Sequence, residues 1–147
     1  MQHDQKYDKY NSPLSHKEIE KAIKSLNNKR ACGHDGIPPE AMKATAPWNI
    51  DNIKTITDEI HRTGKMPEKW KKGRMTLIYK NKGKKDNLDN YRPLTLLTTI
   101  YKIWATAHAN RLNEITHEIT HESQNGFKAG VSTKDNIAIT NKFIKEG

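Results

Sequence analysis

The sequence contains one cysteine, Cys32, among its 147 residues. A single thiol excludes an internal disulfide framework and a cysteine-rich zinc site, and it is consistent with a reducing compartment. Long apolar runs are also missing, since no stretch approaches the ~20 apolar residues of a membrane-spanning helix. The polar start MQHDQKYDKYN does not have the pattern of a signal peptide. We therefore expect a soluble, intracellular protein without membrane contact.

Apolar side chains are scarce as well. Hydrophobic residues make up 33% of the chain, and even with the 8 glycines the apolar share stays below the ~45–50% of ordinary globular proteins. Leu, Ile, Val and Phe supply 26 of the 147 residues, which is under the ~20% level at which disorder becomes a reasonable alternative for a highly charged chain. Periodic apolar segments are nevertheless present. They indicate a piece of a larger fold whose main core lies elsewhere, and a fully flexible chain is the alternative.

Acidic residues are outnumbered, because 26 Lys and Arg face 17 Asp and Glu and give a net charge of +9. Such a surplus favours polyanionic partners such as nucleic acid or nucleotides, and mere solubility is the alternative. The surplus is concentrated in residues 69–85, which hold eight Lys or Arg and no Asp or Glu. This stripe would neutralise phosphates and release counterions, unless it is an ordinary exposed basic loop. Its members are Lys69, Lys71, Lys72, Arg74, Lys80, Lys82, Lys84 and Lys85.

Helical periodicity dominates on both sides of that stripe. Residues 1–13 are polar and are predicted to be a linker or a frayed terminus. The segment LSHKEIEKAIKSL then carries a helix start, with Ser15 as N-cap and Glu18 completing a capping box. The helix over TTIYKIWATAHANRLNEI is expected to bury a face that extends to Leu112. Further helices are predicted from Pro38 and Pro39, over NIDNIKTITDEIHRTG as far as Gly64, and after Ser132 or Thr133.

Strand character is confined to residues 75–97. The β-prone segments RMTLIYK and YRPLTLL flank the polar NKGKKDNLDN, so we predict a β-hairpin with a long loop. Pro93 belongs at the start or edge of a strand, and it holds Arg92 in an extended conformation. Lys80 and Arg92 then meet at the loop end, where an ammonium and a guanidinium suit a polyphosphate. Pairing of Arg92 with Asp89 or another surface carboxylate is the alternative. The leucines expected to anchor this rim to the fold are Leu94, Leu96 and Leu97.

Four segments occur in a fixed order along the chain: NNKRACGHDGIPPEAMK, GKMPEKWKKGRMTLIYKNKGKKDNLDNYRPLTLLTTIYKIW, NRL and SQNGFKAGVSTKDNI. Together they resemble the amino-terminal part of the reverse transcriptases of non-LTR (LINE-type) retrotransposons. The resemblance covers about residues 14–140. It implies an α+β fold, mainly helical with one β-hairpin, which is the fingers part of a right-hand polymerase and an incomplete domain. The implied parts are a helical lead-in over 14–74, the hairpin over 75–97, and helices with a template-side loop over 98–147, with the palm missing.

The resemblance also implies roles for individual residues. Lys80 and Arg92 match the residues that contact the triphosphate of the incoming nucleotide, and the rest of the basic stripe is expected to follow nucleic-acid backbone. The GHDGIPPE turn and Trp70 match positions that are mainly structural. The residues implied to position the template and shape the nucleotide pocket are Gln124, Gly126, Phe127 and Lys128.

The groups that this family needs for catalysis are absent from the sequence. By resemblance, nucleotide transfer depends on two metal ions held by palm carboxylates, including a Tyr-x-Asp-Asp hairpin. No Tyr-x-Asp-Asp occurs here. We predict that this chain alone is inactive, with no catalytic residue and no metal site, and that Mg²⁺ is a cofactor of the full polymerase. The expected partners are an RNA template, a DNA primer, a deoxynucleoside triphosphate, and the remaining palm and thumb.

Two other functions remain open. One is a stand-alone or remnant nucleic-acid-binding module without catalysis, which a natural stop near residue 147 would favour. The other is a zinc protease built on HEITH, in which His117 and His121 would bind zinc and Glu118 would act as base. That motif arises from the doubling of ITHE and has no obvious third ligand. Surface histidines on a polar helix end are therefore the better interpretation.

Overall fold

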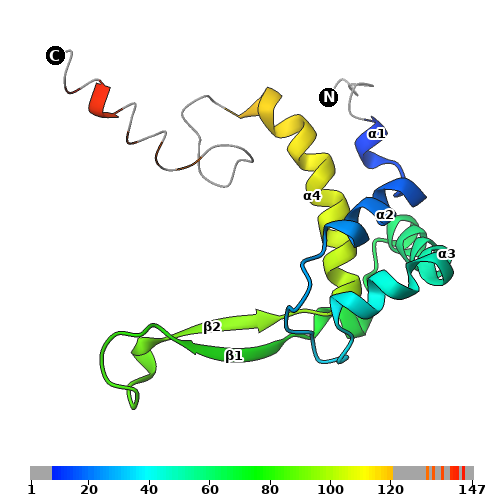
Figure 1. Cartoon of the computed structure of the whole chain (residues 1–147). Coiled ribbons are helices and arrows are strands. Elements are labelled where there is room, and N and C mark those ends of the chain that lie inside the picture. The colour runs from blue at the N-terminus through cyan, green and yellow to red at the C-terminus, as the bar shows by residue number, and fades with distance from the viewer. Residues whose placement is uncertain are drawn as a thin grey trace. The chain divides into compact units, whose positions relative to one another are not determined.

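The computed structural model describes residues 8–120 together with residues 132, 134, 137, 140–142 and 144. The chain divides into two compact units, Met1–Ala107 and His108–Gly147. Its elements are α1 (Asp8–Asn11), α2 (His16–Ser25), α3 (Pro39–Thr63), η2 (Glu68–Lys71), β1 (Arg74–Tyr79), η3 (Leu88–Asn90), β2 (Tyr91–Leu96) and α4 (Thr99–Ile119) (Figure 1). This mixture of helices with one two-stranded antiparallel sheet agrees with the predicted α+β class. Among the described residues, none of the helices has the length and hydrophobicity to cross a lipid bilayer.

Helix α2 begins at the capping box that the sequence predicts. The Ser15 side chain accepts the Glu18 main-chain N–H at 3.3 Å, and the Glu18 carboxylate accepts the Ser15 main-chain N–H at 2.7 Å. The capping box therefore supplies hydrogen-bond acceptors to the main-chain N–H groups of Ser15 and Glu18, which have no acceptor within the helix itself. Behind this cap, Ile19 and Ile23 are buried on one face of the helix. The helix start and its apolar stripe are both confirmed.

Helix α3 is one 25-residue helix where the sequence predicted two helical segments. It follows Pro38 and ends at Thr63, where the Gly64 N–H donates to the Ile60 carbonyl at 2.8 Å. The two segments are joined through Pro47, which lies inside the helix. Proline removes a main-chain donor and ordinarily breaks a helix. Here buried side chains on both sides of it, Met42 and Ile53, pack into the same core and hold the helix together.

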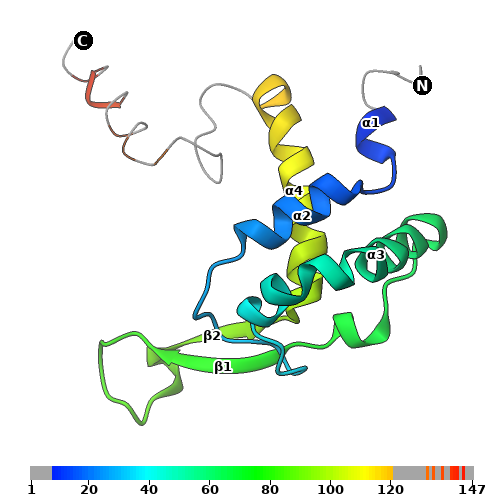
Figure 2. The ribbon, with the colours of Figure 1, turned by 45° about the vertical axis from the view of Figure 1, so that its right-hand side comes forward.

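The core of the first unit is formed by α2, α3 and the first half of α4, which lie against one another in Figure 2. Its buried members are Leu14, Ile19, Ala22, Ile23, Met42, Ile53, Ile103 and Ala107. Trp70 is also buried, with its ring edge-on to Tyr101 at 6.4 Å between centroids, so its predicted packing role is confirmed. The prediction was wrong for Leu112, which is 60% exposed, because the buried residues of α4 recur at four-residue spacing as Ile103, Ala107 and Arg111, and Leu112 lies off that face.

Strands β1 and β2 form a ribbon that extends from the helices of the first unit (Figure 1). Their register pairs Arg74 with Leu96 at one end and Tyr79 with Tyr91 at the loop end, so the hairpin was predicted correctly. The expected anchoring by leucines was only partly right: Leu94 is 45% exposed, and Leu96 and Leu97 are half-buried. The strands pair only with each other, so within the described residues little covers their two faces.

The ribbon is tied to the helices by the GHDGIPPE turn. Gly33 is buried directly against the Leu97–Thr98 peptide, where a Cβ on Gly33 would lie 2.7 Å from the Leu97 carbonyl carbon. The Thr99 hydroxyl donates to the Ile37 carbonyl at 2.6 Å, and the Arg74 guanidinium reaches the Cys32 carbonyl at 3.4 Å. The turn therefore fixes where β2 ends and α4 begins.

Candidate nucleic-acid and nucleotide interface

The proline in β2 sits where its missing N–H does not weaken the ribbon. The Lys80 N–H donates to the Asn90 carbonyl at 2.7 Å, which continues the ladder of β1 and β2 by one pair. Hydrogen-bonded and non-hydrogen-bonded pairs alternate in an antiparallel ladder, so Ile78 with Arg92 is a hydrogen-bonded pair. Leu77 with Pro93 is then a non-hydrogen-bonded pair. The main-chain nitrogen of Pro93 consequently points away from β1.

The same register places Lys80 and Arg92 on one face of the ribbon. Paired residues share a face, and side chains alternate between faces along a strand. Arg92 pairs with Ile78, and Lys80 lies two residues further along toward the loop. The two cations are thus diagonal neighbours, a relation that puts side chains roughly 7–8 Å apart at their bases. Both side chains are exposed. The sequence prediction that these two residues meet near the loop end agrees with this register.

Arg92 is not engaged by the carboxylates considered as its alternative partners. Within the described part of the chain, no ion pair or hydrogen bond involves its guanidinium. Asp89 contacts this pair through its main-chain carbonyl, which accepts a hydrogen bond from the Lys80 ammonium at 2.8 Å. An ammonium has three donors, so Lys80 keeps two for another ligand. The guanidinium of Arg92 keeps all five of its donors.

The predicted basic stripe forms two clusters rather than one continuous surface. Lys69, Lys71 and Lys72 lie at η2, before β1, while the other lysines lie in the loop after it. Between them runs the uncharged part of β1, and a six-residue strand spans roughly 20 Å. In the first cluster, Lys71 is ion-paired with Glu68, and its ammonium holds the pKa of that carboxyl below 4.5. Arg74 is directed to the Cys32 carbonyl, so both residues already have partners within the chain.

The loop between the strands is held by side chains that sequence reasoning did not single out. The Tyr79 hydroxyl donates to the Gly83 carbonyl, and the Tyr91 hydroxyl donates to the Lys85 carbonyl at 2.9 Å. The two tyrosines are cross-strand neighbours with ring centroids 5.4 Å apart. The Asn90 amide donates to the Lys84 carbonyl at 2.7 Å. The sequence does carry a signal for this arrangement, because Tyr79 and Tyr91 flank the loop at equal distances from its centre.

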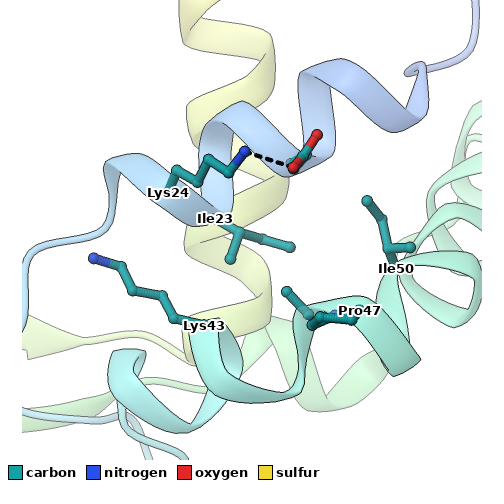
Figure 3. Close-up of a pocket in the computed structure, with 7 residues that line it drawn as sticks. Ile23, Lys24, Lys43, Pro47 and Ile50 are labelled. Atoms are coloured by element: carbon teal, nitrogen blue, oxygen red, sulfur yellow. Dashed lines mark ion pairs between the residues drawn. The ribbon is translucent and has the colours of Figure 1, made fainter.

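A separate cavity of about 510 Å³ lies between α2 and α3. Figure 3 shows Ile23, Pro47 and Ile50 as its apolar lining, with Lys24 and Lys43 at its sides. Glu20 contributes a carboxylate that is paired with Lys24, and that pairing lowers the pKa of Glu20 from 4.5. The sequence-predicted site residues do not line this cavity. We therefore place the candidate site on the ribbon.

Several predicted residues lie outside the described part of the chain. These are Gln124, Gly126, Phe127 and Lys128 of the template pocket, and His121 of HEITH, and the side chains of His117 and Glu118 are outside it too. Their predicted roles stay predictions. Among the residues that are described, no three His, Cys, Asp or Glu side chains gather in a group suited to a metal ion.

Curated relatives match this chain over most of its length. The probable RNA-directed DNA polymerase from transposon BS of Drosophila melanogaster is 34% identical over 134 residues, which are 90% of this chain and 15% of that protein. The probable RNA-directed DNA polymerase from transposon X-element of the same species is 31% identical over 128 residues, 86% of this chain and 14% of that protein. The RNA-directed DNA polymerase from mobile element jockey, also of Drosophila melanogaster, is 25% identical over 138 residues, 92% of this chain and 15% of that protein. The chain thus spans about one seventh of the length of these relatives. No family model matches it.

Proposed function

We propose that this chain is the fingers part of a polymerase. The premise is that the chain belongs to the RNA-directed DNA polymerases of non-LTR retrotransposons and corresponds to one segment of them. The observation that carries the proposal is the position of Lys80 and Arg92, two exposed cations on one face of the ribbon beside its loop. The nucleic-acid template and the nucleotide substrate of the parent enzyme are the partners that this position serves.

Lys80 and Arg92 hold the triphosphate of the incoming nucleotide. A guanidinium forms two parallel hydrogen bonds to phosphate oxygens, and an ammonium acts as a compact point charge beside it. Pro93 restricts the main chain at Arg92 to the extended region, so fewer conformations of the arginine must be given up when it binds. Arg92 also has no carboxylate to release first among the described residues. Two preoriented cations on a rigid ladder offset the charge of the phosphates and align the nucleotide.

The remaining predicted contacts follow from the same assignment. The lysines of the loop and of η2 track phosphates of the template and primer backbone, and Gln124 to Lys128 form part of the template and nucleotide pocket. In this assignment the catalytic carboxylates belong to the palm, so the palm and thumb must join this segment before nucleotide transfer occurs.

A binding module without catalysis is the second function that the sequence allowed, and HEITH suggested a third. The three curated relatives described above are named as RNA-directed DNA polymerases, so neither alternative is favoured. The binding module shares the basic surface with our proposal, but its preference for a triphosphate over a monophosphate would follow the overall charge and would not depend on Lys80 and Arg92 in particular. That difference supplies the test.

The test measures binding of a fluorescently labelled deoxynucleoside triphosphate and of the matching monophosphate to the 147-residue chain. The wild-type chain is expected to prefer the triphosphate. In the K80A/R92A double variant the preference should fall by roughly tenfold or more, because hydrogen bonds to charged groups contribute about 1.5–3 kcal/mol each.

The matched control is the K17A/K21A double variant, which removes the same charge from exposed positions on α2. Long-range attraction would weaken equally in both variants, whereas a local grip is lost only in K80A/R92A. An equal loss in the control, or an unchanged triphosphate preference in K80A/R92A, would contradict the proposed grip.

A further inference from the structure

The loop of residues 81–90 has a fold of its own that its charge composition does not explain. Its three lysines exceed its two aspartates by one, so the sum of charges gives little attraction for a polyanion. The main-chain carbonyls of Gly83, Lys84 and Lys85, three in succession, each accept a hydrogen bond from a side chain at the end of the ribbon. Three of the five main-chain carbonyls of residues 82–86 are therefore already hydrogen-bonded within the chain, and Asp86 adds one exposed carboxylate to the segment.

The donors of the same segment are not used. Within the described residues, the main-chain N–H groups of residues 82–86 donate to no acceptor, while those of Asn87, Asp89 and Asn90 do. All of residues 82–86 are exposed. Successive unpaired N–H groups in a turn form a concave site that favours anions. A phosphate approaching Gly83, Lys84 and Lys85 meets free N–H donors and lysine ammonium groups, while the carbonyl oxygens of these three residues are directed to Tyr79, Asn90 and Tyr91.

Two further features keep the loop in this arrangement. Gly83 has a positive φ of 79°, and a Cβ there would lie 2.5–2.8 Å from the side-chain atoms of Asn90, the residue that holds the Lys84 carbonyl. A side chain at position 83 would therefore be strained and would also displace the Asn90 amide. The Lys85 ammonium lies 5.9 Å from the centre of the Tyr79 ring, a distance at which a cation is attracted to the ring face.

We propose that residues 82–86 form a prefolded phosphate-binding loop for a single-stranded nucleic acid, and that Tyr79, Tyr91 and Asn90 are its positioning residues. The inference rests on the proposed function for the identity of the partner, and it adds a site distinct from Lys80 and Arg92. The phosphates of the nucleic acid bind to the main-chain N–H groups of residues 82–86 and to the side chains of Lys82, Lys84 and Lys85. The tyrosine hydroxyls touch no phosphate and act by holding the loop carbonyls.

The test is binding of a fluorescein-labelled single-stranded RNA oligonucleotide to the full chain at a series of KCl concentrations. Removing the three loop lysines in K82A/K84A/K85A should reduce the slope of log affinity against log salt by about 2, since each phosphate neutralised on a single strand contributes about 0.7. The Y79F/Y91F variant keeps both rings and all charges. Its affinity should fall by up to about 25-fold, which is two fivefold losses of one net hydrogen bond each.

A double-mutant cycle separates positioning from a merely structural role. The loss of log affinity caused by Y79F/Y91F should be measured in the wild-type chain and in the K82A/K84A/K85A variant. In the lysine variant this loss should be at most half of the loss in the wild-type chain. The melting temperature should stay unchanged, because the ribbon is not part of the core. G83A and N90A disturb the loop independently and should weaken RNA binding in the same direction, whereas Y101F, a change to a tyrosine that packs beside Trp70, should not.

The outcomes distinguish this inference from the function on which it rests. If the wild-type chain does not bind the RNA, both are overturned. If the wild-type chain binds with a clear salt dependence and the Y79F/Y91F, G83A and N90A variants bind equally well, only the prefolded loop is overturned. Full additivity of the tyrosine and lysine substitutions would likewise overturn it, because the tyrosines would then act elsewhere.

Discussion

Substitution of Gly33 by alanine should separate the ribbon from the helical core. The added Cβ would lie 2.7 Å from the Leu97 carbonyl carbon and 2.7 Å from the Thr98 nitrogen, whereas ordinary contacts begin near 3.4 Å. Both atoms belong to the main chain at the junction of β2 and α4, so no flexible side chain can turn away. Overpacking of this kind costs about 1–3 kcal/mol, and we expect the upper end, about 3 kcal/mol. For a folded unit of this size, that loss lowers the melting temperature by roughly 12–24 °C.

The control is G36A in the same turn. Gly36 has a positive φ of 69°, and a Cβ added to it would meet no atom within 4 Å, so alanine there adds only backbone strain. That strain costs about 1–2 kcal/mol for a residue with a side chain, and asparagine, which tolerates this conformation, should recover part of it. Thermal unfolding followed by circular dichroism measures both variants. A G33A variant that melts within a few degrees of wild type, or that is no less stable than G36A, would refute a steric clash between position 33 and the Leu97–Thr98 peptide.

Two further predictions concern the core and the acid limit of stability. Truncation of the fully buried Ile103 to alanine should lower the free energy of unfolding by about 2–5 kcal/mol. The L77A variant, on the exposed ribbon, should change that free energy by about 0.5 kcal/mol or less. Equal losses of the two variants in urea denaturation would contradict the assignment of the core. The Glu40 carboxylate accepts the Lys29 main-chain N–H, which lowers the pKa of Glu40 from 4.5. The contribution of this carboxylate to folding stability is therefore present above pH 4.5 and is lost as the pH falls through the lowered pKa. The E40Q variant should be less stable than wild type at neutral pH and should lose less stability on acidification. Parallel stability profiles of the two proteins against pH would argue against this role of Glu40.

The parts of the fold that sequence reasoning predicted correctly depend on neighbouring residues. The capping box of Ser15 and Glu18, the helix start after Pro38 and the stop at Gly64 each involve residues within one helical turn. The two strands were found because their β-prone segments flank a polar loop with glycine. Such signals are complete within a short window, so they do not require knowledge of the tertiary structure.

The parts that were missed depend on contacts distant in sequence. Proline at position 47 indicated a break, and only packing of both halves of α3 into one core keeps the helix continuous. The apolar character of Leu94 indicated burial, but burial needs a covering surface, and the ribbon has little among the described residues. The hydrogen bonds of Tyr79 and Tyr91 to the loop follow from the strand register, which hydrophobic pattern alone did not fix.

Pro93 connects the register of the ribbon with the direction of its cations. In the observed pairing its nitrogen points away from β1, so the ladder loses no hydrogen bond. A slip of one residue would turn β2 over, direct the proline nitrogen at β1 where a donor is needed, and carry Arg92 to the opposite face. That opposite face now bears no charged residue in either strand. The proline therefore disfavours the one pairing error that would separate Arg92 from Lys80, which is a physical reason for an arginine and a proline to stand together at this strand.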